Sequence, residues 1–259
     1  MSTKSKNGAV SEIRRGRVCL RRVLWLPFIV SLACPVFARA QEDFPRAADC
    51  GSPLLGAIYR RDMRTIDKLI EGRNGLDFKG CEVGTTPLIE SIAMGLPEAA
   101  KKLILGDANI NLAGNDGTTP LISVSYYCLE DIVSLLLQRG ARIDATTRDG
   151  DSALISAAQS CVDGKIVRML LKAGANVNFR TTYGNTPINV AAFYGNEEAV
   201  KALVEAGADL TAKNDEGQTA LEIARDRTIG RKPSHNRIYS LLLEKSRAKK
   251  RLVPTKNHA

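Results

Sequence analysis

The sequence Gly-Thr-Thr-Pro-Leu occupies residues 84–88 and returns unchanged at 117–121. Three related versions follow it: Gly-Asp-Ser-Ala-Leu at 150–154, Gly-Asn-Thr-Pro-Ile at 184–188 and Gly-Gln-Thr-Ala-Leu at 217–221. The glycines of this phrase are 33, 33, 34 and 33 residues apart. A second glycine series has intervals of 34, 34, 34 and 33: Gly72, Gly106, Gly140, Gly174 and Gly207. Two marks that share one period indicate a tandem repeat, and a period near 33 is typical of a helix-pair solenoid.

The repeat that begins at Gly117 shows what one copy encodes. Gly117 supplies the positive φ of a tight turn, Thr119 can cap a helix, and Pro120 suits the first helical position, where its missing N–H costs nothing. Two short helices follow, with apolar residues at helical spacing: Leu121, Val124, Ile132, Val133, Leu136 and Leu137. Gly140 is expected to end the second helix in the left-handed conformation. The sequence therefore predicts consecutive helix pairs.

These residues resemble the ankyrin repeat, whose pattern is Gly-x-Thr-Pro-Leu-His-x-Ala-Ala at the first helix and Leu-Leu-x-x-Gly-Ala-Asp/Asn at the second. The second half matches at 170–178, Leu-Leu-Lys-Ala-Gly-Ala-Asn-Val-Asn, and at 203–209, Leu-Val-Glu-Ala-Gly-Ala-Asp. The resemblance covers residues 52–245. It implies an all-α ankyrin-repeat solenoid of about six helix-turn-helix repeats with short β-hairpin fingers, and a surface that binds other molecules.

One departure from the family pattern recurs along the chain. The histidine of the pattern is replaced in every copy, by Ile89, Ile122, Ile155, Asn189 and Glu222. In this family that histidine is understood to connect repeats by hydrogen bonds. Isoleucine at three of the five sites indicates that these repeats depend more on apolar packing.

The repeat domain is expected over residues 52–245, with end repeats that differ from the interior as capping repeats do. Residues 41–51 precede it as an N-terminal segment, and an insertion at 228–236 separates the two helices of the last repeat. Residues 246–259 form a basic tail that we expect to be disordered. The expected repeats cover 52–83, 84–116, 117–149, 150–183, 184–216 and 217–245.

Residues 1–40 have the pattern of a cleaved signal peptide. An arginine cluster precedes an apolar run from Val23 to Ala38, and Ala38-Arg39-Ala40 forms a cleavage site before Gln41. The alternative is a retained membrane anchor. The run between Arg22 and Arg39 has only 16 residues and contains two prolines, whereas a span needs about 20 apolar residues.

Two other export signals fit these residues less well. A lipoprotein site at Cys34 lacks the usual larger apolar residue at position 31, which is serine. A twin-arginine signal at Arg21 and Arg22 lacks the usual flanking residues. The general secretory route is therefore the preferred interpretation.

The net charge of +9 does not indicate a nucleic-acid partner. Residues 1–40 contribute +7 of it, and residues 245–259 contribute +6, which leaves −4 on residues 41–244. A domain with this charge lacks the basic surface that nucleic-acid binding needs. We interpret Lys249-Lys250-Arg251 as part of a solvated tail, with contact to a polyanion or a membrane surface as the alternative. No stable membrane insertion is expected after cleavage.

Four cysteines follow residue 40, and an even number in an exported chain favours disulfides. Cys128 and Cys161 occupy the same point of consecutive repeats. Repeats stack about 9–10 Å apart, beyond the roughly 7 Å Cα limit for a bridge, but an extra residue within 162–165 can bring these turns together. Cys50 and Cys81, at the entries to the first and second repeats, are the second candidate pair. Buried or free thiols are the alternative for both pairs.

The sequence contains no motif that predicts catalysis. Neither a Gly-x-Ser-x-Gly nucleophile motif nor a phosphate-binding loop occurs. The only histidines are His235 and His258, and Cys-x-x-Cys is absent, so no metal site is predicted. We interpret His235 as an exposed loop residue. Neither an enzymatic activity nor a cofactor is expected.

Aromatic residues gather on one expected face of the solenoid. In the ankyrin arrangement, the fingers and the outer side of each first helix line a concave groove. The sixth and seventh residues after the Pro or Ala of each phrase face this groove: Ala93, Met94, Tyr126, Tyr127, Gln159, Ser160, Phe193 and Tyr194. Arg180 and Tyr183 lie at the tip of the finger before the fourth phrase.

Tyr and Arg are favoured at interface hot spots, and five of the ten aromatic residues after residue 40 lie on this face. We therefore expect a protein partner to bind at Tyr126, Tyr127, Arg180, Tyr183, Phe193 and Tyr194. The alternative is that Phe193 and Tyr194 merely pack against the neighbouring repeat.

The sequence thus predicts a monomeric, non-enzymatic protein-binding module that resembles small exported bacterial ankyrin proteins. The periplasm is the expected location, with secretion as the alternative. Two other functions stay open: a protective or structural accessory of an envelope enzyme, and a secreted effector that acts on host proteins. The scaffold does not identify the partner, because proteins with one fold bind many ligands.

Overall fold

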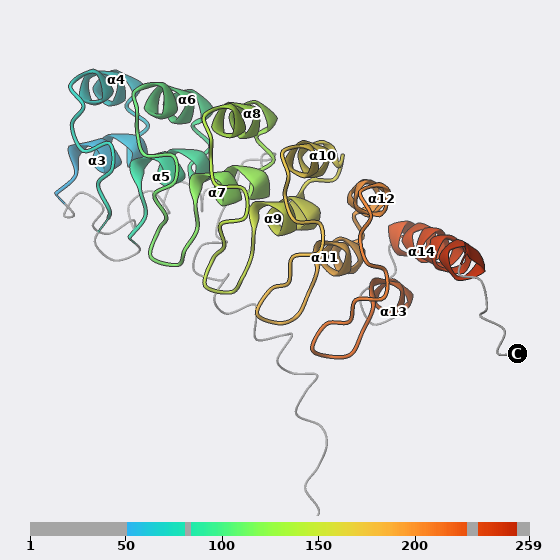
Figure 1. Ribbon diagram of the computed structural model, residues 1–259. Coiled ribbons are helices and arrows are strands. Elements are labelled where there is room, and N and C mark those ends of the chain that lie inside the picture. The colour runs from blue at the N-terminus through green and yellow to red at the C-terminus, as the bar shows by residue number, and fades with distance from the viewer. Residues whose placement is uncertain (1–50, 81–83, 227–232, 253–259) are drawn as a thin grey trace, which may run out of the picture. The chain divides into compact units, whose positions relative to one another are not determined.

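The computed structural model describes residues 51–80, 84–226 and 233–252 (Figure 1). The chain divides into two units, Met1–Pro45 and Arg46–Ala259, and every described residue belongs to the second. The expected signal peptide therefore lies outside the described residues. Within the described ranges, twelve helices follow one another in pairs, each with a first and a second helix.

The first helices of the pairs form one row: α3 (Pro53–Tyr59), α5 (Pro87–Ala93), α7 (Pro120–Tyr126), α9 (Ala153–Ser160), α11 (Pro187–Tyr194) and α13 (Ala220–Arg225). The second helices form another row: α4 (Met63–Glu71), α6 (Pro97–Leu105), α8 (Glu130–Gln138), α10 (Lys165–Lys172), α12 (Glu197–Glu205) and α14 (Pro233–Leu252). Neighbouring helices pack against each other within each row (Figure 1). This arrangement confirms the predicted all-α repeat solenoid.

Side-chain caps begin the first helices where the repeated phrase predicts them. The hydroxyl of Thr119 accepts a hydrogen bond from the N–H of Ile122 at 3.3 Å, and Pro120 is the first helical residue. Equivalent hydroxyl residues precede the other first helices: Ser52, Thr86, Ser152, Thr186 and Thr219. Such a cap satisfies an N–H that has no partner within the helix, which stabilises a helix by about 1 kcal/mol.

The glycines of the second series do not all adopt the left-handed conformation at the end of a second helix. Gly140 has a φ of 80°, so its predicted left-handed conformation is confirmed. Gly72 and Gly106 instead have φ values of −76° and −83°, and the left-handed residue is the next one, Arg73 or Asp107. These two side chains form an ion pair at 2.6 Å between successive pairs.

The fingers between helix pairs are tight turns, so the prediction of β-hairpins is wrong. No strand occurs in the described ranges, where one isolated bridge joins Thr146 and Ser152. In the finger before α9, the Gly150 N–H donates to the Thr147 oxygen at 3.1 Å, and the Thr147 N–H donates to the Asp151 oxygen at 3.0 Å, which closes the finger. The corresponding bonds run from Gly80 to Thr85, Gly114 to Thr118, Thr181 to Asn185 and Asn214 to Gln218. These bonds close a turn but do not continue into the ladder that a strand pair needs.

The core lies between the two rows of helices. Ile89, Ile122 and Ile155 are buried, as expected if apolar packing replaces the histidine network. Asn189 departs from this pattern, because its side-chain amide donates a hydrogen bond to the Gln218 oxygen at 3.3 Å. A polar residue at this position therefore still connects one pair to the next.

The last helix pair differs from the sequence prediction. α14 begins at Pro233, inside the segment 228–236 where the sequence predicts an insertion. His235 lies in its first turn and is only 6% exposed, with Nε2 3.1 Å from the Phe193 oxygen. The interpretation of His235 as an exposed loop residue is therefore wrong. α14 also includes residues 246–252, which the sequence placed in a disordered tail.

Candidate protein-binding surface

Four aromatic residues of the predicted site lie at the C-terminal ends of two first helices. Tyr126 ends α7 and Tyr127 follows it, whereas Phe193 and Tyr194 are the last two residues of α11. The helix α9 lies between α7 and α11 and contacts both. The structure therefore places two aromatic pairs on the same row, separated by one helix.

Each pair holds its rings edge to face. The ring centroids of Tyr126 and Tyr127 are 5.3 Å apart, and those of Phe193 and Tyr194 are 5.2 Å apart. Tyr127 and Phe193 pack against the core, whereas Tyr194 is 44% exposed. Burial raises the pKa of both Tyr126 and Tyr127, so these phenols stay neutral hydrogen-bond donors. Packing against the neighbouring repeat, the alternative interpretation, therefore explains Phe193 better than it explains Tyr194.

The two finger residues of the predicted site lie apart from these aromatic pairs. Tyr183 is 61% exposed on the finger that precedes α11, whereas Tyr194 ends that helix. Eight helical residues span about 12 Å, so the structure does not bring the two tyrosines together. Arg180 donates a hydrogen bond to the Lys213 oxygen at 2.6 Å, which ties its finger to the next one. Arg180 therefore has a structural role in this surface.

Two residues that belong to the same surface were missed in the sequence. Tyr59 is the sixth residue after Pro53, so it follows the same register as Tyr126. Glu90 lies in the middle of α5, three residues after Pro87, and is partly buried. Burial raises the pKa of the Glu90 carboxyl, and the side chains of Tyr59 and Thr85 oppose this effect. The register of the first, degenerate repeat was the signal that could have identified Tyr59.

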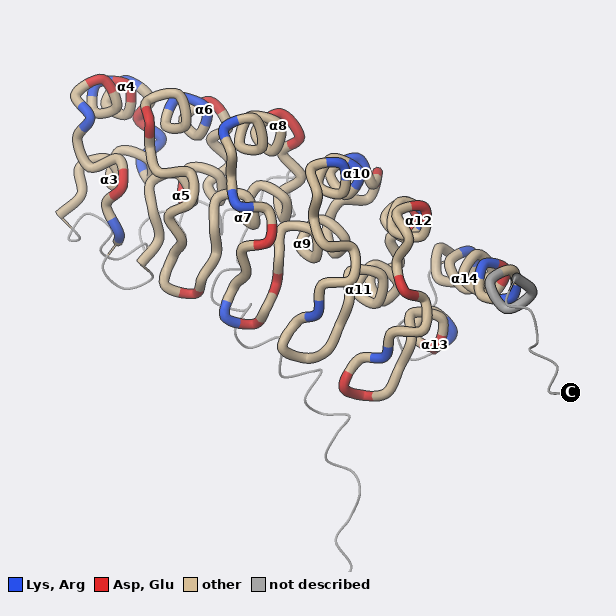
Figure 2. Tube along the Cα trace, viewed as in Figure 1, with Lys and Arg blue, Asp and Glu red and all other residues tan. Residues whose placement is uncertain are grey.

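Charge is distributed unevenly between the two rows of helices. Glu90 is the only charged residue in the sequences of α5, α7, α9 and α11. Figure 2 shows the charged residues on the second helices and the fingers, with the first-helix row largely uncharged. Ion pairs connect neighbouring second helices: Lys102–Asp67 at 2.6 Å, Lys101–Asp131 at 3.7 Å, Lys165–Glu130 at 3.3 Å, Arg168–Glu198 at 3.2 Å and Arg237–Glu197 at 2.5 Å.

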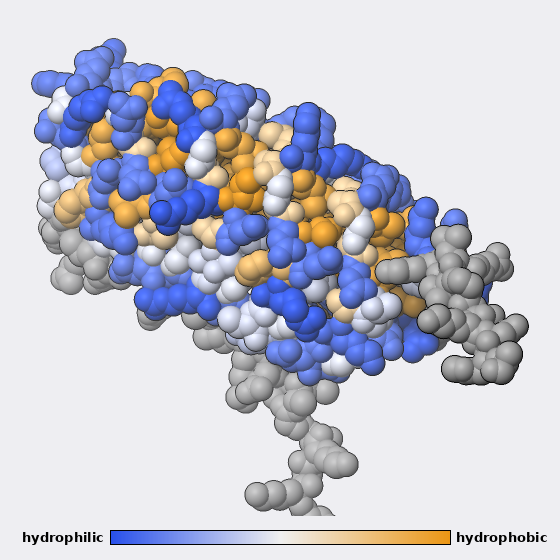
Figure 3. All heavy atoms as spheres, viewed as in Figure 1, coloured by the Kyte–Doolittle hydropathy of each residue, from blue (hydrophilic) through white to orange (hydrophobic). Residues whose placement is uncertain are grey.

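The face in view in Figure 3 has a further apolar feature, a band of hydrophobic residues between two hydrophilic margins. Partly buried aliphatic residues recur at one position where each second helix leads into a finger: Ile110, Ile143, Val177 and Leu210. These four residues pack against the core.

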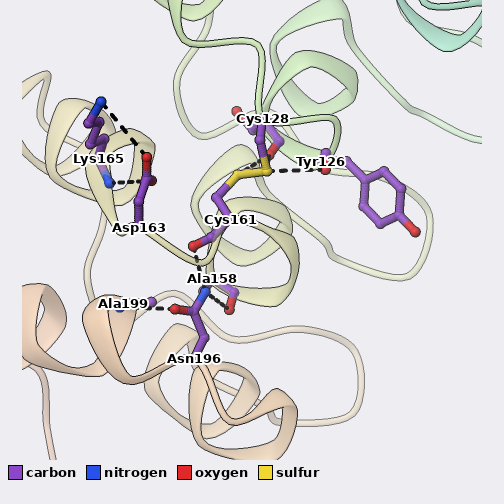
Figure 4. Close-up of a disulfide and its surroundings, with 9 residues drawn as sticks. Tyr126, Cys128, Ala158, Cys161, Asp163, Lys165, Asn196 and Ala199 are labelled. Atoms are coloured by element: carbon purple, nitrogen blue, oxygen red, sulfur yellow. Dashed lines mark hydrogen bonds and ion pairs between the residues drawn. A yellow bond between two sulfur atoms is a disulfide. The ribbon is translucent and has the colours of Figure 1, made fainter. Parts of the chain in front are cut away.

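A disulfide joins the turns that follow α7 and α9, which confirms the predicted pairing of Cys128 with Cys161 (Figure 4). The two Cα atoms are 5.5 Å apart. Cys128 is left-handed with a φ of 59°, but Cys161 is extended, and the left-handed residue of its turn is Gly164. The extra residue in this turn therefore changes its path, as the sequence indicated. Cys50 and Cys81 lie outside the described residues.

Asn196 extends this connection to the next helix pair. Its side-chain amide donates to the oxygens of Cys161 at 2.7 Å and Ala158 at 3.2 Å, and its side-chain oxygen caps α12 (Figure 4). The disulfide and Asn196 together link three consecutive pairs. These contacts hold the first helices that present the aromatic residues.

Among residues 51–80, 84–226 and 233–252, no group of three or more His, Cys, Asp or Glu side chains could hold a metal ion. In the same ranges, no helix has the length and apolar character needed to cross a bilayer.

A family model described as "Ankyrin repeats (3 copies)" matches the chain at residues 54–147, 91–181 and 154–252. These matches span most of the sequence, so the chain belongs to the ankyrin repeat family. Ankyrin repeats generally mediate protein–protein interactions and typically form non-enzymatic binding modules. No curated protein matches the sequence. The number of repeats in this chain stays a prediction.

Proposed function

We propose that the chain is a non-enzymatic binding module that holds a protein partner against its first-helix row, along the concave groove that the family arrangement implies. The observation that carries this proposal is the difference in charge and aromatic content between the two rows of helices. The first-helix row offers two aromatic pairs and one charged residue between α5 and α11, whereas charges on the second helices are engaged in ion pairs.

The difference in charge matters because water must leave the surfaces of both the chain and its partner when they bind. Removing water from apolar and aromatic side chains is favourable, and Tyr side chains lose little conformational entropy when they bind. Charged pairs at an exposed surface cost more to desolvate than their attraction returns. Tyr194 and Tyr183 are the most exposed aromatic residues of the candidate surface, at 44% and 61%. We therefore expect them to contact the partner directly.

We further propose that the protein acts outside the cytoplasm, with the periplasm as its location and residues 1–40 as its signal peptide. The Cys128–Cys161 disulfide supports this proposal, because structural disulfides persist mainly in oxidising compartments. N-terminal sequencing of the exported protein should begin at Gln41. A mature protein that retains residues 20–40, or carries lipid at Cys34, would contradict the proposed route.

The experiment for binding is a capture from envelope extract with the disulfide-intact protein as bait. Binding isotherms of the captured partner are then measured for Tyr194→Ala and Tyr183→Ala. Leu105→Ala is the matched control, because Leu105 is a large apolar residue, 59% exposed, at the end of the second helix α6. We expect the tyrosine variants to bind about fivefold or more weakly, since hot-spot truncation costs about 1 kcal/mol or more.

The control decides between the two rows of helices. If Leu105→Ala abolishes binding while both tyrosine variants bind normally, the partner contacts the second helices and the proposed surface is wrong. Thermal melts of all three variants exclude a general loss of folding. Arg180→Ala is unsuitable for this test, because it also removes the hydrogen bond to the Lys213 oxygen.

A further inference from the structure

The two cysteines of the disulfide differ in their exposure to solvent. Cys161 is only 2% exposed, whereas Cys128 is exposed on the turn that follows α7. Asn196 holds the Cys161 end in place, because its side-chain amide donates to the Cys161 oxygen at 2.7 Å (Figure 4). The bridge therefore has one buried end and one end at the surface.

A hollow of about 220 Å³ lies beside this bridge. It is lined by both cysteines, two apolar residues and two acidic residues: Cys128, Cys161, Val162, Ile166, Glu130 and Asp163. Val162 is 79% exposed, the highest value among the exposed large apolar residues of the described ranges. Lys165 lies 3.3 Å from Glu130 and 4.0 Å from Asp163, so it offsets part of their charge. The hollow thus offers apolar surface next to a sulfur–sulfur bond.

Access decides which sulfur of a disulfide an external thiol can attack. In thiol–disulfide exchange, the thiolate approaches one sulfur from the side opposite the other, and the sulfur that is not attacked leaves. Attack at Cys161 would require entry into the packed interior, where Cys161 Sγ lies 3.0 Å from the oxygen of the buried Ser125. Attack at Cys128 requires approach only from the exposed turn. The geometry therefore favours Cys128.

We propose that Cys128 is the site of thiol–disulfide exchange with an external protein cysteine, and that the hollow receives an apolar side chain next to that cysteine. The external thiolate attacks Cys128 Sγ and forms a mixed disulfide with it. The bond between Cys128 and Cys161 breaks, and its electron pair leaves with Cys161, which takes a proton from water. In the reverse reaction, the Cys161 thiolate attacks Cys128 Sγ and expels the external thiol.

The preference for an apolar side chain comes from Val162 and Ile166. Covering these residues removes apolar surface from water, which is favourable. Val162 lies in the turn that leads from α9 into α10, so this exchange site does not depend on the exposed tyrosines of the proposed binding surface. The inference goes beyond the proposed function, and either can fail without the other.

The first test locates the mixed disulfide in the wild-type chain. The full disulfide-bonded protein is incubated in its folded state with the blocked peptide acetyl-Leu-Cys-Leu-amide. Excess N-ethylmaleimide stops the exchange, and peptide mapping by mass spectrometry separates the products at Cys128 and Cys161 from those at Cys50 and Cys81. We expect the thiol peptide on Cys128 and maleimide on Cys161, with at least about tenfold less of the reverse product.

Two results of this test would overturn the exchange site. One is an equal or larger amount of thiol peptide on Cys161. The other is no exchange in the folded protein under conditions in which the urea-unfolded chain exchanges.

The second test concerns the hollow and uses acetyl-Gly-Cys-Gly-amide as the control peptide. Relative to the rates on the urea-unfolded chain, the leucine peptide should open the folded bridge about fivefold faster than the glycine peptide. Val162→Ser should abolish this difference and leave the rate of the glycine peptide unchanged. Leu105→Ser is the matched control, because Leu105 is also apolar and exposed but lies outside the hollow, and it should keep the difference.

Equal relative rates of the two peptides on the wild-type chain would refute the role of the hollow. An undiminished difference in Val162→Ser would refute it as well. Thermal melts check that both serine variants fold, and if either does not, the two peptides on the wild-type chain still decide.

Discussion

Asp151 is the one charged residue at a position that is neutral in the other copies of the phrase: Thr85, Thr118, Asn185 and Gln218. Burial, with a further effect of the charge on Asp149, raises the pKa of Asp151 from 3.8 to about 6. Its charged form is therefore less stable in the folded protein than in the unfolded chain. The backbone of Asp151 still closes its finger through hydrogen bonds with Thr147.

Asp151→Asn should therefore stabilise the protein at neutral pH, by up to about 3 kcal/mol. Because the folded pKa lies above the unfolded one, stability is lost as the pH rises from about 4 to about 6. The gain from the substitution should be complete above pH 6 and absent below about pH 4. Denaturant unfolding of both proteins at pH 4, 5, 6 and 7 measures this, and a gain that does not change with pH would contradict the pKa argument.

Leu136→Ala should destabilise the protein by about 2–5 kcal/mol, because Leu136 on α8 is completely buried and its truncation leaves a cavity. Leu105→Ala removes the same atoms from a side chain that is 59% exposed and should change the free energy of unfolding by about 0.5 kcal/mol or less. Thermal and urea unfolding of the two variants make the comparison. Similar losses in both would mean that Leu136 is not in the core described.

At the scale of helices and turns, the repeated phrase was enough to place the first helices. Thr119 and Pro120 act locally, so their roles could be predicted from sequence alone. The start of α14 could not, because an insertion breaks the register and conceals that His235 faces Phe193. The left-handed conformation of Arg73 was also hidden, since no residue type marks it.

For the candidate site, too, the positions along the helices could be predicted from the sequence, but the contacts between repeats could not. Tyr126 and Phe193 follow the repeat register, so their place at the ends of first helices was readable from the sequence. The hydrogen bond from Arg180 to the Lys213 oxygen depends on a contact between repeats, which no spacing reveals.

The disulfide should contribute about 3–4 kcal/mol, because it closes a loop of 33 residues in the unfolded chain. The double variant Cys128→Ala/Cys161→Ala should lose that amount in urea unfolding. Mass analysis without reductant should find this pair joined in protein isolated from the envelope, and four freely alkylated thiols after residue 40 would contradict it. Adding reductant should destabilise the wild-type protein more than the variant.

Asn196→Ala should cost about 1–3 kcal/mol, because it removes a helix cap and the amide donor that binds the buried oxygens of Ala158 and Cys161. Asn236→Ala, at an exposed position on α14, is the control and should be close to neutral. Unfolding measured with the disulfide intact separates the effect of Asn196 from that of the bridge. Equal stability of the two variants would show that Asn196 does not couple the pairs.

At the scale of the whole molecule, the two rows of helices in the described part of the chain have different roles. Ion pairs connect neighbouring second helices at the exposed surface, and the first helices present aromatic side chains. The contacts that support the first-helix row are covalent at Cys128–Cys161 and hydrogen-bonded at Asn196. A preformed surface loses less entropy on binding than a mobile one.

Hydroxyl-radical footprinting of the captured complex tests the central claim most directly, because it reports which side chains the partner covers. The account predicts that Tyr183 and Tyr194 are protected in the complex, while Leu105 on α6 is oxidised as in the free protein. Protection of Leu105 and unchanged oxidation of both tyrosines would contradict it, because the partner would then lie on the second-helix row.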